Sequence, residues 1–245
     1  MTTPKVALIT GAVKRIGATI SRTLHKEGYN LVLHYRHSSD EASKLMTELN
    51  QQRPGSAITV QADLNDMDAL QPLVDSALSE WGGIDLLVNN ASSFYPTPLD
   101  TSTQQQWDEL INSNLRAPYF LCSKLAESLR ERNGCIINLI DIHAQRGLPG
   151  HPIYSIAKAG LQMMTLSLAK ELAPSVRVNG VSPGPILWPE AAMSDEQKGA
   201  ILEQTLLGKT GTPEDLAGAV LYLSTARFVT GQVLCVDGGK SLYSH

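Results

Sequence analysis

The chain has 245 residues, of which 42% are hydrophobic and 18% are charged, a composition that fits an ordered core and excludes extended disorder. Its formal net charge is −4 at pH 7, and no block of like charge stands out, which disfavours a nucleic-acid binder held by bulk electrostatics. The three cysteines, Cys122, Cys135 and Cys235, form no C-x-x-C pair. We therefore expect neither a disulfide framework nor a thiolate zinc site, and a reducing cytoplasm suits them. With no basic leader and no run of about 18 apolar residues, neither secretion nor membrane spanning is expected.

Short β-branched runs alternate with longer stretches of helical period, and this alternation is typical of βαβ units and a parallel sheet. The predicted strands cover residues 5–10, 30–35, 57–61, 84–88, 135–140, 176–181 and 233–236. The helical patterns lie at about 15–27, 40–52, 66–81, 103–131, 152–173, 195–206 and 214–223. Two helix starts are well marked, because Ser194 begins a capping-box pattern and Thr212 precedes a proline at a first helical position.

These elements predict one α/β domain over residues 1–245, with a doubly wound, seven-stranded parallel sheet and helices on both faces. The least regular segment, about 184–211, begins with several prolines and glycines. We expect it to form a mobile lid over a site.

A glycine-containing loop, residues 10–17, follows the first strand and opens the first helix, where backbone amides and the helix dipole favour a pyrophosphate. Gly11 permits a tight turn and Gly17, after Ile16, permits close helix packing. Arg15 stands where dinucleotide sites of this type commonly carry another glycine. Its guanidinium can reach cofactor phosphates or a substrate anion, and the alternative is a solvent-facing charge.

The second predicted strand ends in basic and polar residues, in the order His34, Tyr35, Arg36, His37 and Ser38. An NAD site usually places an acid near this position for the ribose 2′-hydroxyl, and none is present. Donors here suit a 2′-phosphate, so we expect NADPH rather than NADH, with an ordinary polar turn as the alternative. The two histidines have no third ligand nearby, and no metal site is expected.

Two further strand ends carry candidate cofactor contacts. Asp63, followed by Leu64, comes after the third strand, where its carboxylate can accept from an adenine amino group or cap a helix. Asn90 and Ala91 follow the fourth strand. Small and amide-bearing residues at this edge allow a ribose to approach the backbone.

Tyr154 and Lys158 are four residues apart in a helical stretch, which places phenol and ammonium on one face. A nearby cation favours phenolate, so we expect Lys158 to lower the pKa of Tyr154 and make it a proton donor at working pH. The Y-x-x-x-K spacing alone is a weak signal. Together with the glycine loop, the Asn89-Asn90-Ala91 turn after the fourth strand and Asn114 in the long fourth helix, it indicates a catalytic site.

These motifs resemble those of the short-chain dehydrogenases/reductases over essentially the full length, including Pro183-Gly184 and the late Asp237-Gly238-Gly239 motif. The resemblance implies a Rossmann-type fold in which Tyr154 is the general acid. It implies that Lys158 binds the nicotinamide ribose, that Asn114 supports a proton-relay water, and that Pro183 and Gly184 contact the cofactor. A homotetramer is also implied.

One position departs from the family. Thirteen residues before Tyr154, where most members have serine, this chain has Asp141. An ionised aspartate cannot donate the hydrogen bond that polarises a ketone, so a simple carbonyl is a poorer substrate. It can accept from a heterocycle N–H or, once protonated, pass a proton to a ring nitrogen. This pairing favours reduction of a C=N bond.

Within the larger family, the chain is similar to the pteridine reductases at Arg15, His34-Tyr35, residues 90–98 and Asp141. The resemblance implies that Phe94 and the nicotinamide sandwich a pterin, that Ser92 and Arg15 contact the pterin or cofactor phosphates, and that NADPH reduces biopterin- or folate-type pterins to dihydro and tetrahydro forms. The order Arg36-His37 is reversed relative to that group. Residues 186–210, with Trp188 and Met193 as possible substrate contacts, match least.

Three alternatives stay open at this point. One is a reductase that prefers dihydromonapterin or dihydrofolate. Another is a 3-oxoacyl or general carbonyl reductase, against which Asp141 and Phe94 argue. The third, from a different class, is a binding protein that senses NADPH without turnover, against which Tyr154, Lys158 and Asn114 argue.

Overall fold

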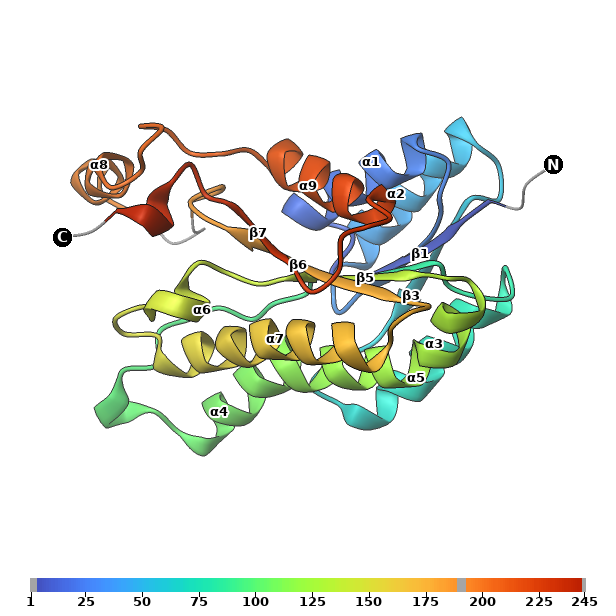
Figure 1. The fold of residues 1–245 in the computed structure, drawn as a ribbon, viewed down its shortest axis with the longest axis horizontal. Coiled ribbons are helices and arrows are strands. Elements are labelled where there is room, and N and C mark those ends of the chain that lie inside the picture. The colour runs from blue at the N-terminus through green and yellow to red at the C-terminus, as the bar shows by residue number, and fades with distance from the viewer. Residues whose placement is uncertain (1–3, 189–192, 244–245) are drawn as a thin grey trace.

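The computed structural model describes residues 4–188 and 193–243. Its strands are β1 Val6–Ile9, β2 Asn30–Tyr35, β3 Ala57–Gln61, β4 Leu86–Asn89, β5 Cys135–Leu139, β6 Arg177–Pro183 and β7 Val233–Val236. All form one parallel sheet in the order β3-β2-β1-β4-β5-β6-β7 (Figure 1). The predicted seven-stranded parallel α/β fold is confirmed.

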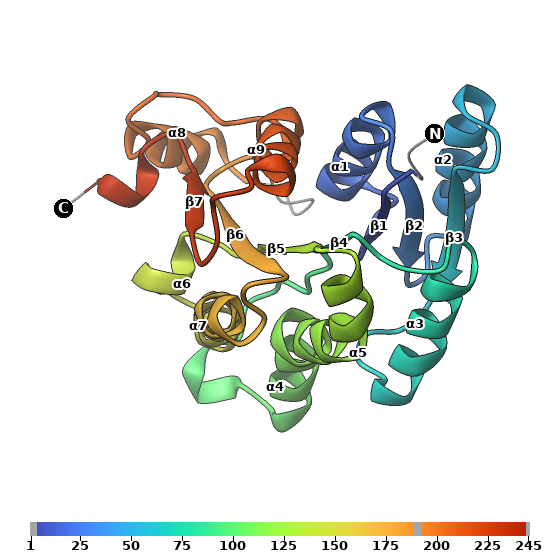
Figure 2. The ribbon, with the colours of Figure 1, turned by 45° about the vertical axis from the view of Figure 1, so that its right-hand side comes forward.

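Helices cover both faces of the sheet (Figure 2). One layer contains α1 Arg15–Lys26, α2 Ser39–Gln52 and α9 Pro213–Thr225. The opposite layer contains α3 Leu70–Ser79, α5 Ala117–Glu131 and α7 Pro152–Glu171. The remaining helices are α4 Gln104–Ile111, α6 His143–Arg146 and α8 Asp195–Glu203, with short turns η1 Met67–Ala69, η2 Leu99–Thr101, η3 Asn112–Arg116 and η4 Lys240–Leu242.

The central strands are apolar on both sides, which explains their continuous hydrophobic runs. Along β1, Ala7 and Ile9 pack into the cluster with α1 and α9, while Val6 and Leu8 pack into the opposite cluster. Successive side chains alternate between the two faces of a strand, so a strand covered by helices on both sides must be apolar throughout. The last strand, β7, lies at the sheet edge and is less buried.

The strand order reverses between β1 and β4, because β1 pairs with β2 on one side and β4 on the other. At such a reversal the crossover connections leave the sheet in opposite directions, and their loops part at the carboxyl ends of the strands. The glycine loop after β1 and the Asn90 turn after β4 therefore face the same crevice.

Several element limits differ from those predicted. The 103–131 stretch is not one uniform α-helix: α4 and α5 are separated by the π-helical segment η3, which contains Asn114. The short helix α6 was not predicted, and α8 ends at Glu203 rather than near 206. The capping box predicted at Ser194 and the helix start predicted at Thr212, with a proline at its first position, are both confirmed, and Thr212 also forms a capping box.

The segment predicted as a lid is described at 184–188 and 193–211, and residues 189–192 lie outside the described range. Its closure over a site stays a prediction. None of the helices in the described part of the chain is long and apolar enough to cross a membrane.

Candidate active site

A cleft of about 390 Å³ opens where the strand order reverses. It brings together residues predicted separately from four strand ends: Gly11 and Arg15 to Gly17 after β1, Arg36 after β2, Asp63 and Leu64 after β3, and Asn90 to Ser92 after β4. Ligands of open parallel sheets bind at this edge. The cleft is therefore the candidate dinucleotide site.

The glycine loop fits closely against the turn after β4. Gly11 has φ +61°, a backbone conformation that side-chain-bearing residues rarely adopt, and a Cβ at Gly17 would lie 2.0 Å from the Gly11 carbonyl oxygen. The Asn90 side-chain amide donates to the carbonyl oxygens of Thr10 and Gly11 at 2.9 and 3.0 Å. Asn90 thus holds the loop, a contact that the sequence prediction of a ribose approach did not include.

Arg15, at the start of α1, has a left-handed backbone with φ +49°. This conformation costs an arginine about 1 kcal/mol or more, which explains why glycine is common at this position in similar loops. Its guanidinium Nη2 donates to the Trp188 carbonyl oxygen at 3.1 Å, so the side chain crosses from the loop to the segment after β6. Ile16, half-buried, lines the cleft beside it.

His34 is buried at the end of β2, with 2% of its surface exposed. Its Nδ1 accepts from the Gly11 amide at 3.1 Å, and its Nε2 lies 3.1 Å from the Ala62 carbonyl oxygen. Burial lowers the pKa of His34 to about 4, so the ring is neutral at physiological pH.

The residues predicted to hold a 2′-phosphate lie at the mouth of the cleft or beside it. Arg36 is exposed, and its guanidinium pairs with the Asp63 carboxylate at 2.9 Å. His37 is exposed, and Ser38 occupies the N-cap position of α2. Tyr35 packs partly against the core. Arg36 and Asp63, predicted to contact different parts of a cofactor, thus also contact each other.

The catalytic candidates converge beside Ser92, which lines the cleft. The Tyr154 hydroxyl, on α7, donates to Asp141 Oδ2 at 2.9 Å, and Asp141 Oδ1 accepts from the His143 amide at 2.8 Å. Lys158 is 2% exposed; its Nζ donates to the Leu139 carbonyl oxygen at 2.9 Å and lies 5.6 Å from the centre of the Tyr154 ring. The predicted juxtaposition of these three side chains is present in the structure.

Electrostatics in this cluster differ from the prediction. Burial, the Asp141 charge and the hydrogen bond to Asp141 raise the pKa of Tyr154 well above its ordinary value. The net shift is opposite to the predicted lowering, because the Asp141 carboxylate contacts the hydroxyl directly while the Lys158 ammonium lies 5.6 Å from the ring centre. Burial lowers the pKa of Lys158 to about 8, against an opposing effect of Asp141. Tyr154 therefore keeps its proton at neutral pH.

Asn114 connects the catalytic region to the turn after β4. Its Oδ1 accepts from the Ser92 hydroxyl at 2.7 Å, and its Nδ2 donates to the carbonyl oxygens of Ser93 and Leu110 at 2.9 and 3.0 Å. These contacts fix the Ser92 loop against the π-helical segment. Support of a relay water by Asn114 stays a prediction.

Phe94 forms an aromatic contact that the sequence did not reveal. The ring is 48% exposed; it stacks on His151 with 4.7 Å between centroids and 6° between planes, and meets Tyr154 edge to face at 4.8 Å. His151 was not among the predicted site residues. It is 57 residues from Phe94 in the chain, and no local pattern connects the two.

Pro183 and Gly184, at the end of β6, join the segment after β5 to the end of β7. The Pro183 carbonyl oxygen accepts from the Ile142 amide at 3.2 Å, and the Gly184 amide donates to the Val236 carbonyl oxygen at 3.0 Å. A Cβ on Gly184 would lie 2.6 Å from the Asp237 Cα, so the close approach of β6 and β7 requires glycine. Their predicted cofactor contact stays a prediction.

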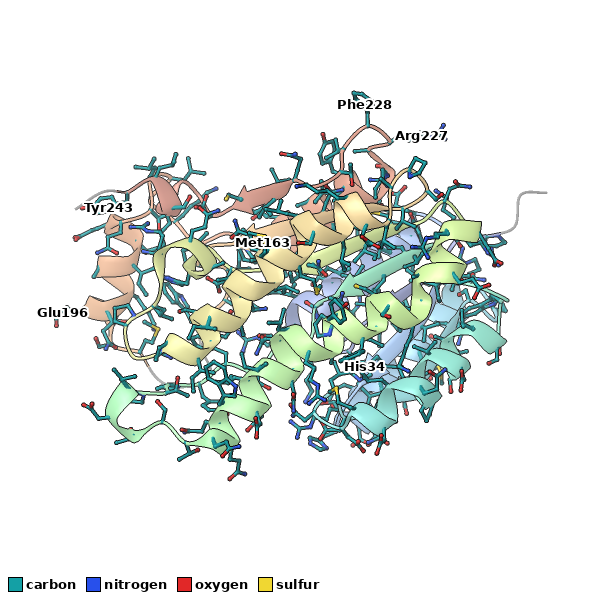
Figure 3. The ribbon with its side chains drawn as sticks, turned by 60° about the horizontal axis from the view of Figure 1, so that its bottom comes forward. His34, Met163, Glu196, Arg227, Phe228 and Tyr243 are labelled. Carbon is teal, nitrogen blue, oxygen red and sulfur yellow. The ribbon has the colours of Figure 1, made fainter. Side chains whose placement is uncertain are left out.

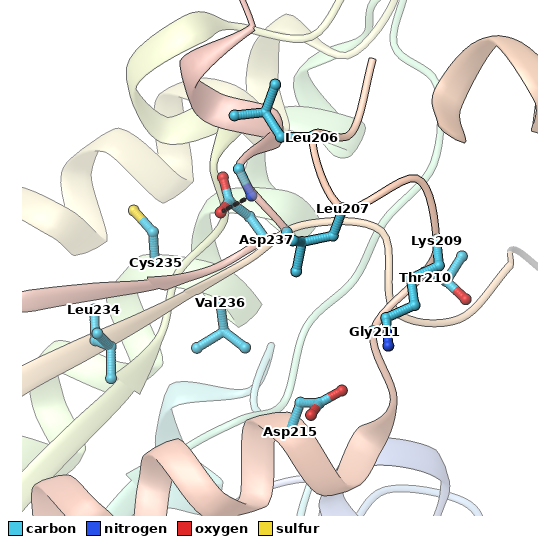
Figure 4. Close-up of a pocket in the computed structure, with 12 residues that line it drawn as sticks. Leu206, Leu207, Lys209, Thr210, Gly211, Asp215, Leu234, Cys235, Val236 and Asp237 are labelled. Atoms are coloured by element: carbon cyan, nitrogen blue, oxygen red, sulfur yellow. Dashed lines mark hydrogen bonds between the residues drawn. The ribbon is translucent and has the colours of Figure 1, made fainter. Parts of the chain in front are cut away.

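A second cavity of about 510 Å³ lies beside the end of β7, between Leu234, Val236 and Asp215 of α9 (Figure 4). The Asp237 carboxylate there accepts from the Gly239 amide at 3.0 Å, so that it supports the turn into η4. The cavity is larger than the cleft but is lined by none of the catalytic candidates.

Comparisons with known proteins agree with this geometry. The family model described as enoyl-(acyl carrier protein) reductase matches residues 11–241. Pteridine reductase 1 from Leishmania tarentolae is 38% identical over 281 aligned positions, covering 98% of this chain and 97% of that protein. A 3-oxoacyl-(acyl-carrier-protein) reductase from Staphylococcus epidermidis is 36% identical, covering 96% and 98%. A 3beta-hydroxysteroid dehydrogenase from Eggerthella lenta is 34% identical, covering 98% and 94%.

The chain belongs to the short-chain dehydrogenase/reductase family, and it is an oxidoreductase. The family's cofactors are NAD(H) and NADP(H), so a nicotinamide dinucleotide is expected in the cleft.

Proposed function

We propose that the protein is an NADPH-dependent pteridine reductase, which transfers hydride to oxidised or dihydro pterins of the biopterin and folate type. The observation that carries the proposal is the pairing of Asp141 with Tyr154 at 2.9 Å directly beside the exposed ring of Phe94. A carboxylate that accepts from N–H groups and an aromatic ring that stacks on a flat heterocycle suit a pterin better than an aliphatic ketone.

The cleft fits the proposed cofactor in three respects. First, within the described residues no side chain caps α1 and no acid occupies its first turn, which leaves its positive end suited to a pyrophosphate. Second, Arg36 offers a guanidinium where an NAD site would place an acid. Third, Gly11 and Gly17 allow the backbone to approach closely. Arg36 with His37 and Ser38 would hold the 2′-phosphate, and Asp63 and Leu64 the adenine end.

Bound NADPH supplies the hydride, and the protein must supply a proton at nitrogen to complete reduction of a C=N bond. Tyr154 is the proposed donor, because its raised pKa keeps the hydroxyl protonated until a basic ring nitrogen is within reach. Asp141 orients the phenol and accepts from substrate N–H groups. Lys158, charged below about pH 8, stabilises the phenolate left by proton transfer until solvent returns the proton.

Ser92 and Arg15 are proposed contacts with the pterin or with the cofactor phosphates. Ser92 is exposed in the cleft and held by Asn114, and the Arg15 side chain extends across to Trp188. Both donors can bind an exocyclic oxygen of the pterin or a cofactor phosphate.

The competing candidate is a carbonyl reductase, favoured by relatives of comparable identity that are named for 3-oxoacyl and hydroxysteroid substrates. NADPH oxidation by the purified protein separates them in one panel of biopterin, dihydrobiopterin, dihydrofolate and an acetoacetyl thioester, with NADH as the cofactor control. We expect turnover of the pterins with NADPH. Activity confined to the thioester would overturn the proposal, and a preference for dihydrofolate would support the folate-type alternative.

We also propose a homotetramer, which is common in the family. Apolar side chains stand exposed on α5, α7 and the C-terminal edge, namely Tyr119, Phe120, Ile156, Met163 and Leu234. Figure 3 shows Met163 and Phe228 on the surface. Sedimentation velocity is expected to give the mass of four chains; a single-chain mass would contradict this.

A further inference from the structure

We propose that His34 is a positioning residue for the cofactor cleft: its neutral imidazole ties the phosphate-binding loop to the turn after β3, and so sets the spacing between the phosphate and adenine ends of the cleft. The inference depends on binding of NADPH in this cleft, as proposed above, but not on which substrate is reduced.

The first step is the hydrogen-bond chemistry of the ring. The Gly11 amide can only donate, so His34 Nδ1 must be the unprotonated nitrogen that accepts from it at 3.1 Å. The hydrogen is then on Nε2, which donates to the Ala62 carbonyl oxygen at 3.1 Å. Both nitrogens are used, and one tautomer satisfies both partners.

The second step is the position of those partners. Gly11 lies in the glycine loop, and Ala62 directly precedes Asp63 and Leu64, which line the cleft after β3. His34 is buried and hydrogen-bonded to both of them; Figure 3 labels its position in the molecule. Two main-chain hydrogen bonds join the same segments at the end of β2. The Ala12 amide donates to the His34 carbonyl oxygen, and the Ala62 amide donates to the Tyr35 carbonyl oxygen.

The third step is that no shorter or apolar side chain serves both contacts. An asparagine Oδ1 can take the place of Nδ1 and accept from Gly11, but its amide does not extend to Ala62. A glutamine amide can extend to Ala62 in place of Nε2 while losing the fixed geometry toward Gly11. A phenylalanine fills the space but leaves the partly buried Gly11 amide and the buried Ala62 carbonyl oxygen without this partner, which loosens both the glycine loop and the turn after β3.

The chain offers a matched control in His25. It is also buried, at 5% exposure, and its Nε2 lies 2.7 Å from the Ser56 hydroxyl, but it does not line the cleft. His25→Phe therefore removes a buried imidazole hydrogen bond without changing a contact of the glycine loop or of the turn after β3.

The test is calorimetric titration of NADPH and of 2′,5′-ADP into wild type, His34→Phe, His34→Asn, His34→Gln and His25→Phe. We expect His34→Phe to raise the Kd for NADPH at least about tenfold and His25→Phe to leave it within about twofold. Steady-state kinetics should show a raised KM for NADPH with kcat at saturating cofactor unchanged.

His34→Asn and His34→Gln each keep one of the two contacts of the ring, and they test the proposal even if His34→Phe fails to fold. We expect His34→Gln, which retains the Ala62 contact, to bind 2′,5′-ADP more tightly than His34→Asn. Wild-type NADPH affinity in all folded His34 variants would overturn the proposal, as would equal weakening in His25→Phe. Wild-type binding of NADPH without pterin turnover would instead overturn the proposed function and leave this test intact.

Discussion

The cofactor end and the substrate end of the candidate active site are built in different ways. The cofactor end is held by partly buried polar contacts within the protein: His34, on β2, and Asn90, after β4, bind the glycine loop from the two strands that flank β1. The substrate end presents exposed side chains, above all Phe94, which stacks on the partly exposed His151 and meets Tyr154 edge to face.

This difference separates two tasks. A rigid, internally bonded end binds one cofactor in one geometry, whereas exposed side chains on loops can be exchanged without unfolding the sheet. Relatives of 34% to 38% identity carry the names of pterin, 3-oxoacyl and hydroxysteroid enzymes, as expected if substrate choice depends on the exposed end. Changes at the two ends should therefore have separable effects.

The largest expected effect is at the catalytic residue between the two ends. Tyr154→Phe removes the hydroxyl and keeps the ring that contacts Phe94, so kcat should fall by about 10²- to 10⁴-fold while the Kd for NADPH changes little. Stopped-flow absorbance and calorimetry measure the two quantities. An unchanged biological output in a cell carrying this variant would favour the sensing protein over the enzyme.

At the cofactor end, Arg15→Gly distinguishes the backbone strain at residue 15 from the contribution of its side chain to NADPH binding. Glycine adopts the positive φ of Arg15 without penalty, so the free energy of unfolding should stay within about 1 kcal/mol of wild type. Loss of the charged donor should weaken NADPH binding about tenfold. Chemical denaturation and calorimetric titration would test both. Unchanged affinity would show that the guanidinium makes no contact with a ligand phosphate.

At the substrate end, Phe94→Leu should raise the KM for dihydrobiopterin about fivefold, because a stacked aromatic pair contributes about 1 kcal/mol beyond its buried area. The Kd for NADPH should not change. Phe228→Leu is the matched control, since Phe228 is fully exposed, does not line the cleft and makes none of the ring contacts of Phe94. An equal rise in the KM for dihydrobiopterin in both variants would contradict the assignment of Phe94 to the substrate end. So would a change in the Kd for NADPH alone.

The smallest expected effect is a shift in pH dependence. Lys158 loses its charge as the pH rises through its pKa of about 8, so kcat should fall on the alkaline side near that value. Asp141 raises the pKa of Lys158, so Asp141→Asn should move this fall to lower pH, by less than about one unit. A kcat that stays level well above pH 8 would show that the ammonium charge is not needed.

The sheet was predictable because its central strands are apolar on both faces and its helices begin at local capping signals such as Ser194 and Thr212. Arg15 was visible as an unusual residue, but only the backbone showed the left-handed conformation it must adopt. The roles of His34 and His151 could not be predicted, because their partners come from distant segments. The raised pKa of Tyr154 depends on an Asp141 distance that spacing alone does not fix.

The most direct test of the central claim is the ratio of kcat/KM for dihydrobiopterin to that for an acetoacetyl thioester, measured with NADPH in wild type and Asp141→Ser. Serine donates a hydrogen bond that a carbonyl can use and removes the carboxylate that accepts from pterin N–H groups. We predict that the ratio falls at least about tenfold, or about 1.4 kcal/mol of transition-state stabilisation, while NADPH binding persists. An unchanged ratio would contradict the claim that Asp141 selects the pterin.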